Sequence, residues 1–108
     1  MSQQNKLGTG HTIVKTDKTG KTTITFWSTD IVKFDGKTIT LTSGGYQTAT
    51  TKTKMNQASS QFNLGYRVVQ ENYKWYVYFM GKKFIFDDGM ILNRNPKAKQ
   101  NNMEVKIK

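Results

Sequence analysis

Aromatic and basic side chains alternate along residues 73–83 in a pattern that can bind nucleic acid. Because successive side chains of a strand point to opposite faces, Lys74, Tyr76 and Tyr78 share one face. Rings beside ammonium groups can hold a single strand, with the rings stacked on bases and the lysines close to phosphates. The alternative interpretation is that these tyrosines are ordinary half-buried strand residues.

A second basic cluster lies where the one predicted helix begins. Lys52 and Lys54 follow the hydroxyls of Thr50 and Thr51. A helix N-terminus offers free N–H groups and the positive end of the helix dipole, which suit a phosphate. Simple solvation of surface lysines is the alternative. The candidate nucleic-acid-binding residues are Lys52, Lys54, Arg67, Lys74, Tyr76, Tyr78, Lys82 and Lys83. Three further aromatic residues could extend this surface, namely Trp27, Tyr46 and Tyr66.

The chain offers little for catalysis. It has no cysteine, and His11 is its single histidine, without an evident partner to position it as a general base. Asp87 and Asp88 are adjacent, but a Mg²⁺ site usually recruits more oxygen ligands than two. A turn before Gly89 explains them better. We therefore expect no catalytic residue, no metal site and no cofactor, and a protein that is not an enzyme.

The charge favours an anionic partner. Seventeen basic residues face seven acidic ones, for a net charge of +10. Residues 11–94 carry twelve basic and six acidic side chains, so the excess does not come from the chain ends alone. Lysine dominates over arginine, which suits attraction to a phosphate backbone more than reading of bases. We expect a nucleic-acid partner, single-stranded by preference, and an acidic protein surface is the alternative. No apolar run approaches the ~20 residues of a membrane span, so no membrane partner is expected.

Strands must position most of these residues. Alternation predicts strands near residues 11–16, 22–28, 30–34, 37–42, 66–71, 74–80 and 83–86. Asp35-Gly36 predicts a hairpin, and a two-residue loop there would pair Phe34 with Lys37. The predicted fold class is α+β. It is an antiparallel sheet of six or seven strands or a small open barrel, in the order ββββ-α-βββ, with one helix packed on it.

The helix is predicted near residues 51–63, where the period changes. Met55, Ala58, Ser59 and Phe62 form a narrow stripe at helical spacing. Thr50 or Thr51 is the expected N-cap, and Asn63 with Gly65 can supply a left-handed C-cap.

The chain is expected to have three parts. Residues 1–10 are interpreted as a flexible arm, residues 11–94 as a single α+β domain and residues 95–108 as a basic tail. In that tail, Met103, Val105 and Ile107 alternate with charged residues. The alternation allows a short added strand, whereas the composition favours disorder.

Five stretches of the chain together resemble a known group of proteins. The stretches are Phe26–Val32, Asp35–Leu41, Ser43–Tyr46 with Thr48 and Thr50–Lys52, Met55–Ala58, and Phe86–Met90. They are similar to small uncharacterised proteins of tailed bacteriophages, over about residues 11–91. The resemblance implies an early or accessory phage protein that works in the host bacterial cytoplasm. The group has no known activity. If the partner is an acidic protein, the resemblance implies that it is a protein of the host.

Overall fold

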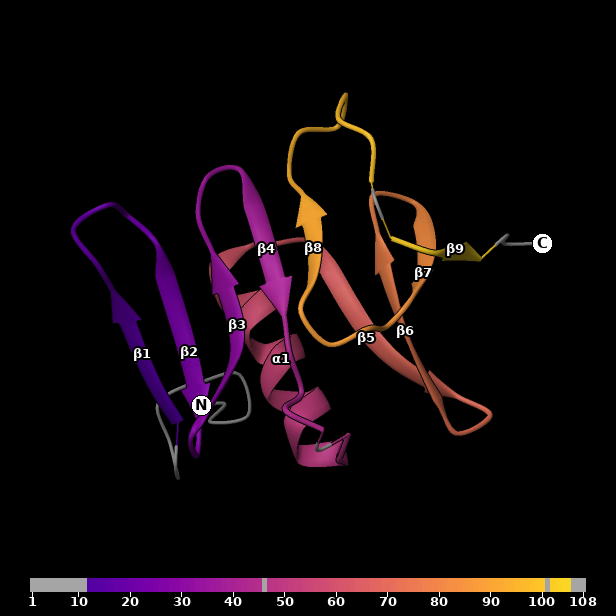
Figure 1. The fold of residues 1–108 in the computed structure, drawn as a ribbon, viewed down its shortest axis with the longest axis horizontal. Coiled ribbons are helices and arrows are strands. Elements are labelled where there is room, and N and C mark those ends of the chain that lie inside the picture. The colour runs from indigo at the N-terminus through magenta and orange to yellow at the C-terminus, as the bar shows by residue number, and fades with distance from the viewer. Residues whose placement is uncertain (1–11, 46, 101, 106–108) are drawn as a thin grey trace.

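The computed structural model describes residues 12–45, 47–100 and 102–105. In these residues the chain forms nine strands and one helix (Figure 1). In chain order they are β1 (Thr12–Thr16), β2 (Thr22–Phe26), β3 (Thr29–Phe34), β4 (Thr38–Leu41), α1 (Ala49–Phe62), β5 (Tyr66–Glu71), β6 (Lys74–Phe79), β7 (Lys82–Ile85), β8 (Met90–Asn93) and β9 (Glu104–Val105).

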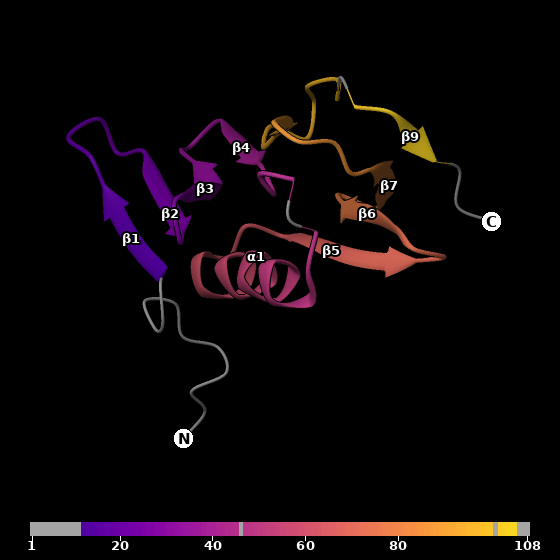
Figure 2. The same ribbon diagram turned by 60° about the horizontal axis from the view of Figure 1, so that its bottom comes forward.

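The described strands form two antiparallel sheets. The first has the order β1-β2-β3-β4-β8 and the second the order β5-β6-β7-β9. Because β8 pairs with β4, the chain returns to the first sheet after building most of the second. Figure 2 shows α1 beneath the first sheet and alongside β5, at the open side between the two sheets.

One hydrophobic core joins both sheets and the helix. Most strands send alternate side chains inward, as period two requires, whereas β3 buries the consecutive residues Ile31 and Val32 where its pairing with β2 shifts register. The fully buried side chains include Ile24, Val32, Ile39 and Leu41 of the first sheet, Met55 and Ala58 of α1, and Val68, Val77 and Phe84 of the second sheet. The inward face predicted for β6 is confirmed, since Trp75, Val77 and Phe79 are all buried.

Side chains of α1 seal the outer edge of β5. The Asn56 side-chain amide donates to the Val68 carbonyl at 2.9 Å and accepts from the Val68 N–H at 2.8 Å. One turn on, the Ser59 hydroxyl donates to the Tyr66 carbonyl at 2.6 Å and accepts from the Tyr66 N–H at 3.1 Å. The helix therefore supplies the hydrogen bonds that a neighbouring strand would make, as buried backbone groups require.

The outer edge of β8 is covered in the same way. The Gln100 side chain donates to the Asn93 carbonyl and accepts from the Asn93 N–H, both at 2.8 Å. Asn102 donates to the Ile91 carbonyl at 2.8 Å. Gln100 and Asn102 of the predicted basic tail are thus attached to the first sheet. Its strand interpretation holds for Glu104–Val105, which pairs with β7, and disorder does not hold there.

The connection after β4 is fixed by two contacts. The Asp88 carboxylate accepts from both the N–H and the hydroxyl of Ser43 at 2.7 Å. Gly44 has φ +65°, and a Cβ there would lie 2.7 Å from Thr29 Oγ1. Both the backbone angle and the close approach therefore require glycine.

The α+β class with one helix packed on antiparallel strands is confirmed. The predicted single sheet of six or seven strands is instead two sheets, because the helix separates β4 from β5 and β8 returns to pair with β4. β8 itself was not predicted, since it is short and follows the turn at Asp87-Asp88-Gly89. The hairpin register is wrong by two residues: Phe34 pairs with Ile39, since the Asp35 carboxylate accepts the N–H groups of Lys37 and Thr38 and so begins the turn.

The helix begins before the predicted position. Thr48 is the N-cap, and its hydroxyl accepts from the Thr51 N–H at 3.2 Å. The predicted left-handed C-cap is confirmed at Asn63, with φ 58°. No helix in the described residues is long and apolar enough to cross a membrane.

Candidate nucleic-acid interface

The outer surface of β5, β6 and β7 gathers most of the candidate residues. Antiparallel pairing places Arg67 opposite Tyr78, and Tyr78 opposite Lys83, in one row across three strands. Their chain neighbours Val68, Val77 and Phe84 form the buried row on the other face. We call the outer surface the tyrosine face; it consists of Arg67, Val69, Glu71, Lys74, Tyr76, Tyr78, Lys83 and Ile85.

Lys83 is held within the tyrosine face. Its ammonium lies 2.6 Å from the Glu71 carboxylate, 4.4 Å from the ring centroid of Tyr76 and 5.7 Å from that of Tyr78. The Tyr78 hydroxyl donates to the same carboxylate at 3.2 Å. Because only 16% of the Lys83 side chain is exposed, its charge is committed to these three neighbours.

Electrostatics follows from this geometry. The hydrogen bond from Lys83 holds the pKa of Glu71 below its usual value, and the reciprocal bond raises the pKa of Lys83. Both groups are therefore charged at neutral pH. A cation within about 6 Å of an aromatic ring is attracted to the ring face, so Lys83 fixes the orientation of Tyr76 and Tyr78.

Arg67 and Lys74 supply the remaining cations of the tyrosine face. Both are exposed, and neither forms an ion pair with any residue that the structure describes. Arg67 lies level with Tyr78, and Lys74 lies two residues before Tyr76 on the same face. They are the groups in this surface that can meet a phosphate.

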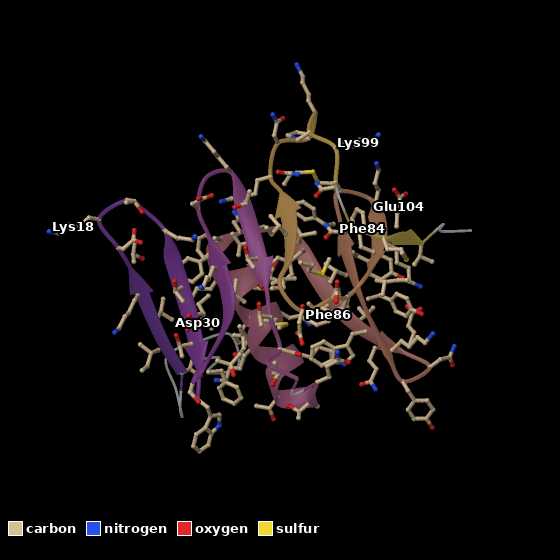
Figure 3. The ribbon with its side chains drawn as sticks, viewed as in Figure 1. Lys18, Asp30, Phe84, Phe86, Lys99 and Glu104 are labelled. Carbon is tan, nitrogen blue, oxygen red and sulfur yellow. The ribbon has the colours of Figure 1, made fainter. Side chains whose placement is uncertain are left out.

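Lys82 is separated from these residues. It pairs with Phe79 and so belongs to the opposite face of β7 from Lys83. Its ammonium lies 3.9 Å from the carboxylate of Glu104 in β9, a residue that Figure 3 labels. The alternation predicts a strand only from residue 83, whereas β7 already begins at Lys82. Because neighbouring residues of a strand point to opposite faces, Lys82 and Lys83 diverge.

Lys52 and Lys54 lie farther into α1 than a helix beginning near residue 51 would place them. Because the helix begins at Ala49, Lys52 closes the first turn and Lys54 lies in the second. The Lys52 N–H already donates to the Thr48 carbonyl at 3.1 Å. These lysines therefore do not flank the free N–H groups of the helix end.

Of the three further aromatic residues, Tyr66 and Trp27 do not extend the tyrosine face. Tyr66 is in the core, where its hydroxyl donates to the Met55 carbonyl and burial raises its pKa strongly. Trp27 lies in the β2–β3 turn of the other sheet, with φ 57° and 62% exposure. Tyr46 lies outside the described residues.

A cavity of about 650 Å³ opens beside Trp27 and the start of α1. Its walls include Trp27 but none of the eight candidate nucleic-acid-binding residues. Its walls are formed by Phe26, Trp27, Ser28, Thr29, Ile31, Ser43, Thr48, Thr50 and Thr51.

The acidic residues that were considered for metal binding, Asp87 and Asp88, lie in the turn before β8. The Asp88 carboxylate accepts from Ser43 across the first sheet, and Asp87 is exposed. Among the described residues, no three His, Cys, Asp or Glu side chains gather closely enough to hold a metal ion. His11 lies outside these residues.

Sequence reasoning missed Glu71 as part of the interface. The sequence could have indicated it: a two-residue turn at Asn72-Tyr73 sets Glu71 opposite Lys74, and hence on the same face as the tyrosines.

Comparison with known proteins gives one family. The family model described as Kyanoviridae Gp96 protein matches residues 1–93. No curated protein and no solved structure matches the chain. The family match confirms the resemblance to small phage proteins.

Proposed function

We propose that this chain, which belongs to the Kyanoviridae Gp96 protein family, binds single-stranded nucleic acid with little sequence specificity. The observation that carries the proposal is the row Arg67–Tyr78–Lys83 with Tyr76 beside it on an outer sheet face. The protein then acts in the host bacterial cytoplasm as a binding module without catalytic turnover.

In this proposal the two rings are the stacking platform. Lys83 covers one side of the ring pair, and a base stacks on the side that it leaves open. Each stacked base is worth about 1–3 kcal/mol. Stacking accepts every base, because each one has a π-face, and this gives binding without sequence readout.

Arg67 and Lys74 contact the backbone of the bound strand. Arg67 can bind a phosphate with two N–H groups, whereas Lys74 acts as a point charge. Lys83 was predicted to lie close to a phosphate. In this proposal its ammonium instead orients the rings, because Glu71 already neutralises it.

An NMR titration with a short oligonucleotide tests the proposal at about 0.15 M salt, near physiological ionic strength. We expect shifts in β5–β7 that centre on Tyr76 and Tyr78. Replacing Tyr76 by Ala should weaken binding by about 1–3 kcal/mol if its ring stacks on a base. Tyr73→Ala is the matched control, since Tyr73 lies in the β5–β6 turn and is 94% exposed. Equal losses in both variants, or no shifts on the sheet face, would rule the tyrosine face out.

A second candidate function is binding to an acidic surface of a host protein. The exposure of Tyr73 favours it, because tyrosine is among the side chains that anchor protein interfaces. A positively charged chain would also be steered towards an acidic partner. In a pull-down from host lysate, a partner that survives nuclease treatment and is lost with Tyr73→Ala supports this function. Loss of everything on nuclease treatment supports nucleic-acid binding.

A further inference from the structure

Three connections of the first sheet end at the same edge of the molecule. They are residues 17–21 between β1 and β2, residues 35–37 between β3 and β4, and the start of the connection after β8 at residue 94 (Figure 1). The pairing explains their alignment, because Thr16 pairs with Thr22 and Thr22 with Phe34 in one row. Thr38 pairs with Asn93, so the third connection begins at the level of the second.

Basic residues concentrate in these connections. We call them the basic edge; they are Lys18, Lys21, Lys37, Arg94, Lys97 and Lys99. Figure 3 shows Lys18 in the first connection and Lys99 in the third, both on the outside of the ribbon. The connections contain only two acids, Asp17 and Asp35, so the basic edge has a surplus of four positive charges.

The two carboxylates are turned towards the backbone. Asp17 accepts from the N–H groups of Thr19 and Lys21 at 2.9 and 3.0 Å, and also from the Thr19 hydroxyl at 2.6 Å. Asp35 accepts from the N–H groups of Lys37 and Thr38 at 2.8 and 2.9 Å. Because these bonds hold each carboxylate in its own turn, the lysine side chains around them keep their ammonium groups for solvent or a ligand.

The second and third connections are also fixed to each other. The Arg94 guanidinium donates to the Asp35 carbonyl at 2.5 Å, and the Arg94 N–H donates to the Lys37 carbonyl at 2.8 Å. Lys21 lies near the same turn. The N–H groups of Thr38 and Lys37 are the main cause of the lowered pKa of Asp35, and the charge of Lys21 lowers it further. The cations therefore lie on an ordered support.

The composition of the basic edge selects its partner. Residues 17–21, 35–37 and 94–99 contain no large apolar side chain. A protein interface normally has an apolar or aromatic centre, and a membrane-binding surface normally inserts apolar side chains. A polyanion held by charge alone needs neither, and the phosphate backbone of nucleic acid is such a partner.

We propose that the basic edge binds the phosphate backbone of nucleic acid that extends past the tyrosine face. This inference rests on the proposed function. The chain itself connects the two surfaces, because the segment that carries Lys97 and Lys99 continues into β9, and Val105 of β9 pairs with Lys83 of the tyrosine face. A short strand then occupies the tyrosine face alone, and a longer one reaches both surfaces.

The test compares two strand lengths over a salt series. Oligonucleotides of about 6 and about 30 nucleotides lie within and well above the usual site size of a single binding module, which is about 4–16 nucleotides. Lys37→Gln with Lys99→Gln removes two charges of the basic edge. Lys15→Gln with Lys33→Gln removes two charges from the outer face of the first sheet and is the control; Lys33 is paired there with Asp30 at 3.7 Å.

The long strand should show the effect. The edge pair should lower the slope of log affinity against log salt by about 1.4, at about 0.7 for each phosphate contact on a single strand. The fall in affinity between 50 and 200 mM salt then becomes roughly sevenfold smaller. The short strand should bind the edge pair and the unchanged protein alike, and the control pair should leave the slope near its original value.

Each other result has one meaning. Equal slopes for the edge pair and the control pair show that only net charge matters and overturn the edge proposal. Binding of the short strand with no edge effect on the long one overturns the basic edge and leaves the tyrosine face standing. An edge effect on the long strand with no short-strand binding overturns the tyrosine face instead. Binding to phosphatidylserine vesicles but to neither oligonucleotide rejects both.

Discussion

Removing the Asn56 side chain should unfold the protein at a clearly lower temperature. Asn56→Ala deletes both hydrogen bonds to the backbone of Val68, a residue that is only 1% exposed. The Val68 N–H and carbonyl would then be buried without partners, and each such group costs about 1–3 kcal/mol. Allowing for partial relaxation of the edge, we expect a loss of about 2–4 kcal/mol.

Thermal unfolding followed by circular dichroism measures this loss. At about 4 °C per kcal/mol for a chain of this size, Tm should fall by about 8–16 °C. Thr53→Ala is the matched control, because Thr53 lies exposed on the same helix. If both variants unfold at similar temperatures, the Asn56 amide does not hold the β5 edge.

Asn56→Asp gives a second readout that helix propensity alone cannot produce. An ionised carboxylate can accept the Val68 N–H but cannot donate to the carbonyl, whereas the protonated acid can do both. The folded state then favours the protonated form, so the carboxyl pKa is raised above its unfolded value. The stability of this variant relative to the unchanged protein should be highest at acid pH and fall as pH rises through that raised pKa. A relative stability that does not change with pH would contradict the proposed pair of bonds.

Further expectations concern the β4 connection, the tyrosine face and catalysis. Gly44→Ala should lose about 1–2 kcal/mol to backbone strain alone, with more from contact with Thr29, and Thr29→Ala should restore part of the loss in a denaturation double-mutant cycle. The depressed pKa of Glu71 implies that its ion pair with Lys83 stabilises the fold above the unfolded pKa and is lost as pH falls through the folded one; a carboxyl NMR titration should show the Glu71 pKa rising in Lys83→Ala, and an unchanged value would contradict the pairing. Nuclease and phosphatase assays with Mg²⁺ or Mn²⁺ should detect no turnover, and activity that disappears in Asp87→Asn would overturn the non-catalytic proposal.

Period-two patterning predicted much of the second sheet. Trp75, Val77 and Phe79 alternate so regularly that their burial, and the outward position of Tyr76 and Tyr78, followed from the sequence. The α+β class followed equally well, because the single change of period between Gly45 and Gly65 marks one helix. Local pattern was sufficient wherever the strand was long and its faces differed in polarity.

The remainder depended on contacts distant in sequence. Asp88 looks like an ordinary turn residue until β8 returns to β4 and brings it to Ser43. Glu71 and Lys83 lie on different strands, so their ion pair follows only once the register is known. The basic edge was missed for the same reason, since its six cations come from three separate connections that the first sheet aligns.

Part of the phage-like signature has a structural explanation. Met55–Ala58 places Met55 and Ala58 in the core and Asn56 on the β5 edge. Phe86–Met90 contributes Asp88, which holds the β4 connection. These two stretches therefore explain how the fold is built, whereas the stretch Asp35–Leu41 also contributes Lys37 to the basic edge.

The side chains that seal β5 and β8 also affect how copies of this protein behave towards one another. An uncovered strand edge can pair with the edge of another molecule and begin aggregation. Asn56 and Ser59 occupy those hydrogen-bonding positions on β5, and Gln100 and Asn102 occupy them on β8. The protection depends on a helix and on a late segment of the chain, so it is complete only after both have docked. A newly made chain is consequently most prone to self-association during the interval before Gln100 and Asn102 have docked on β8.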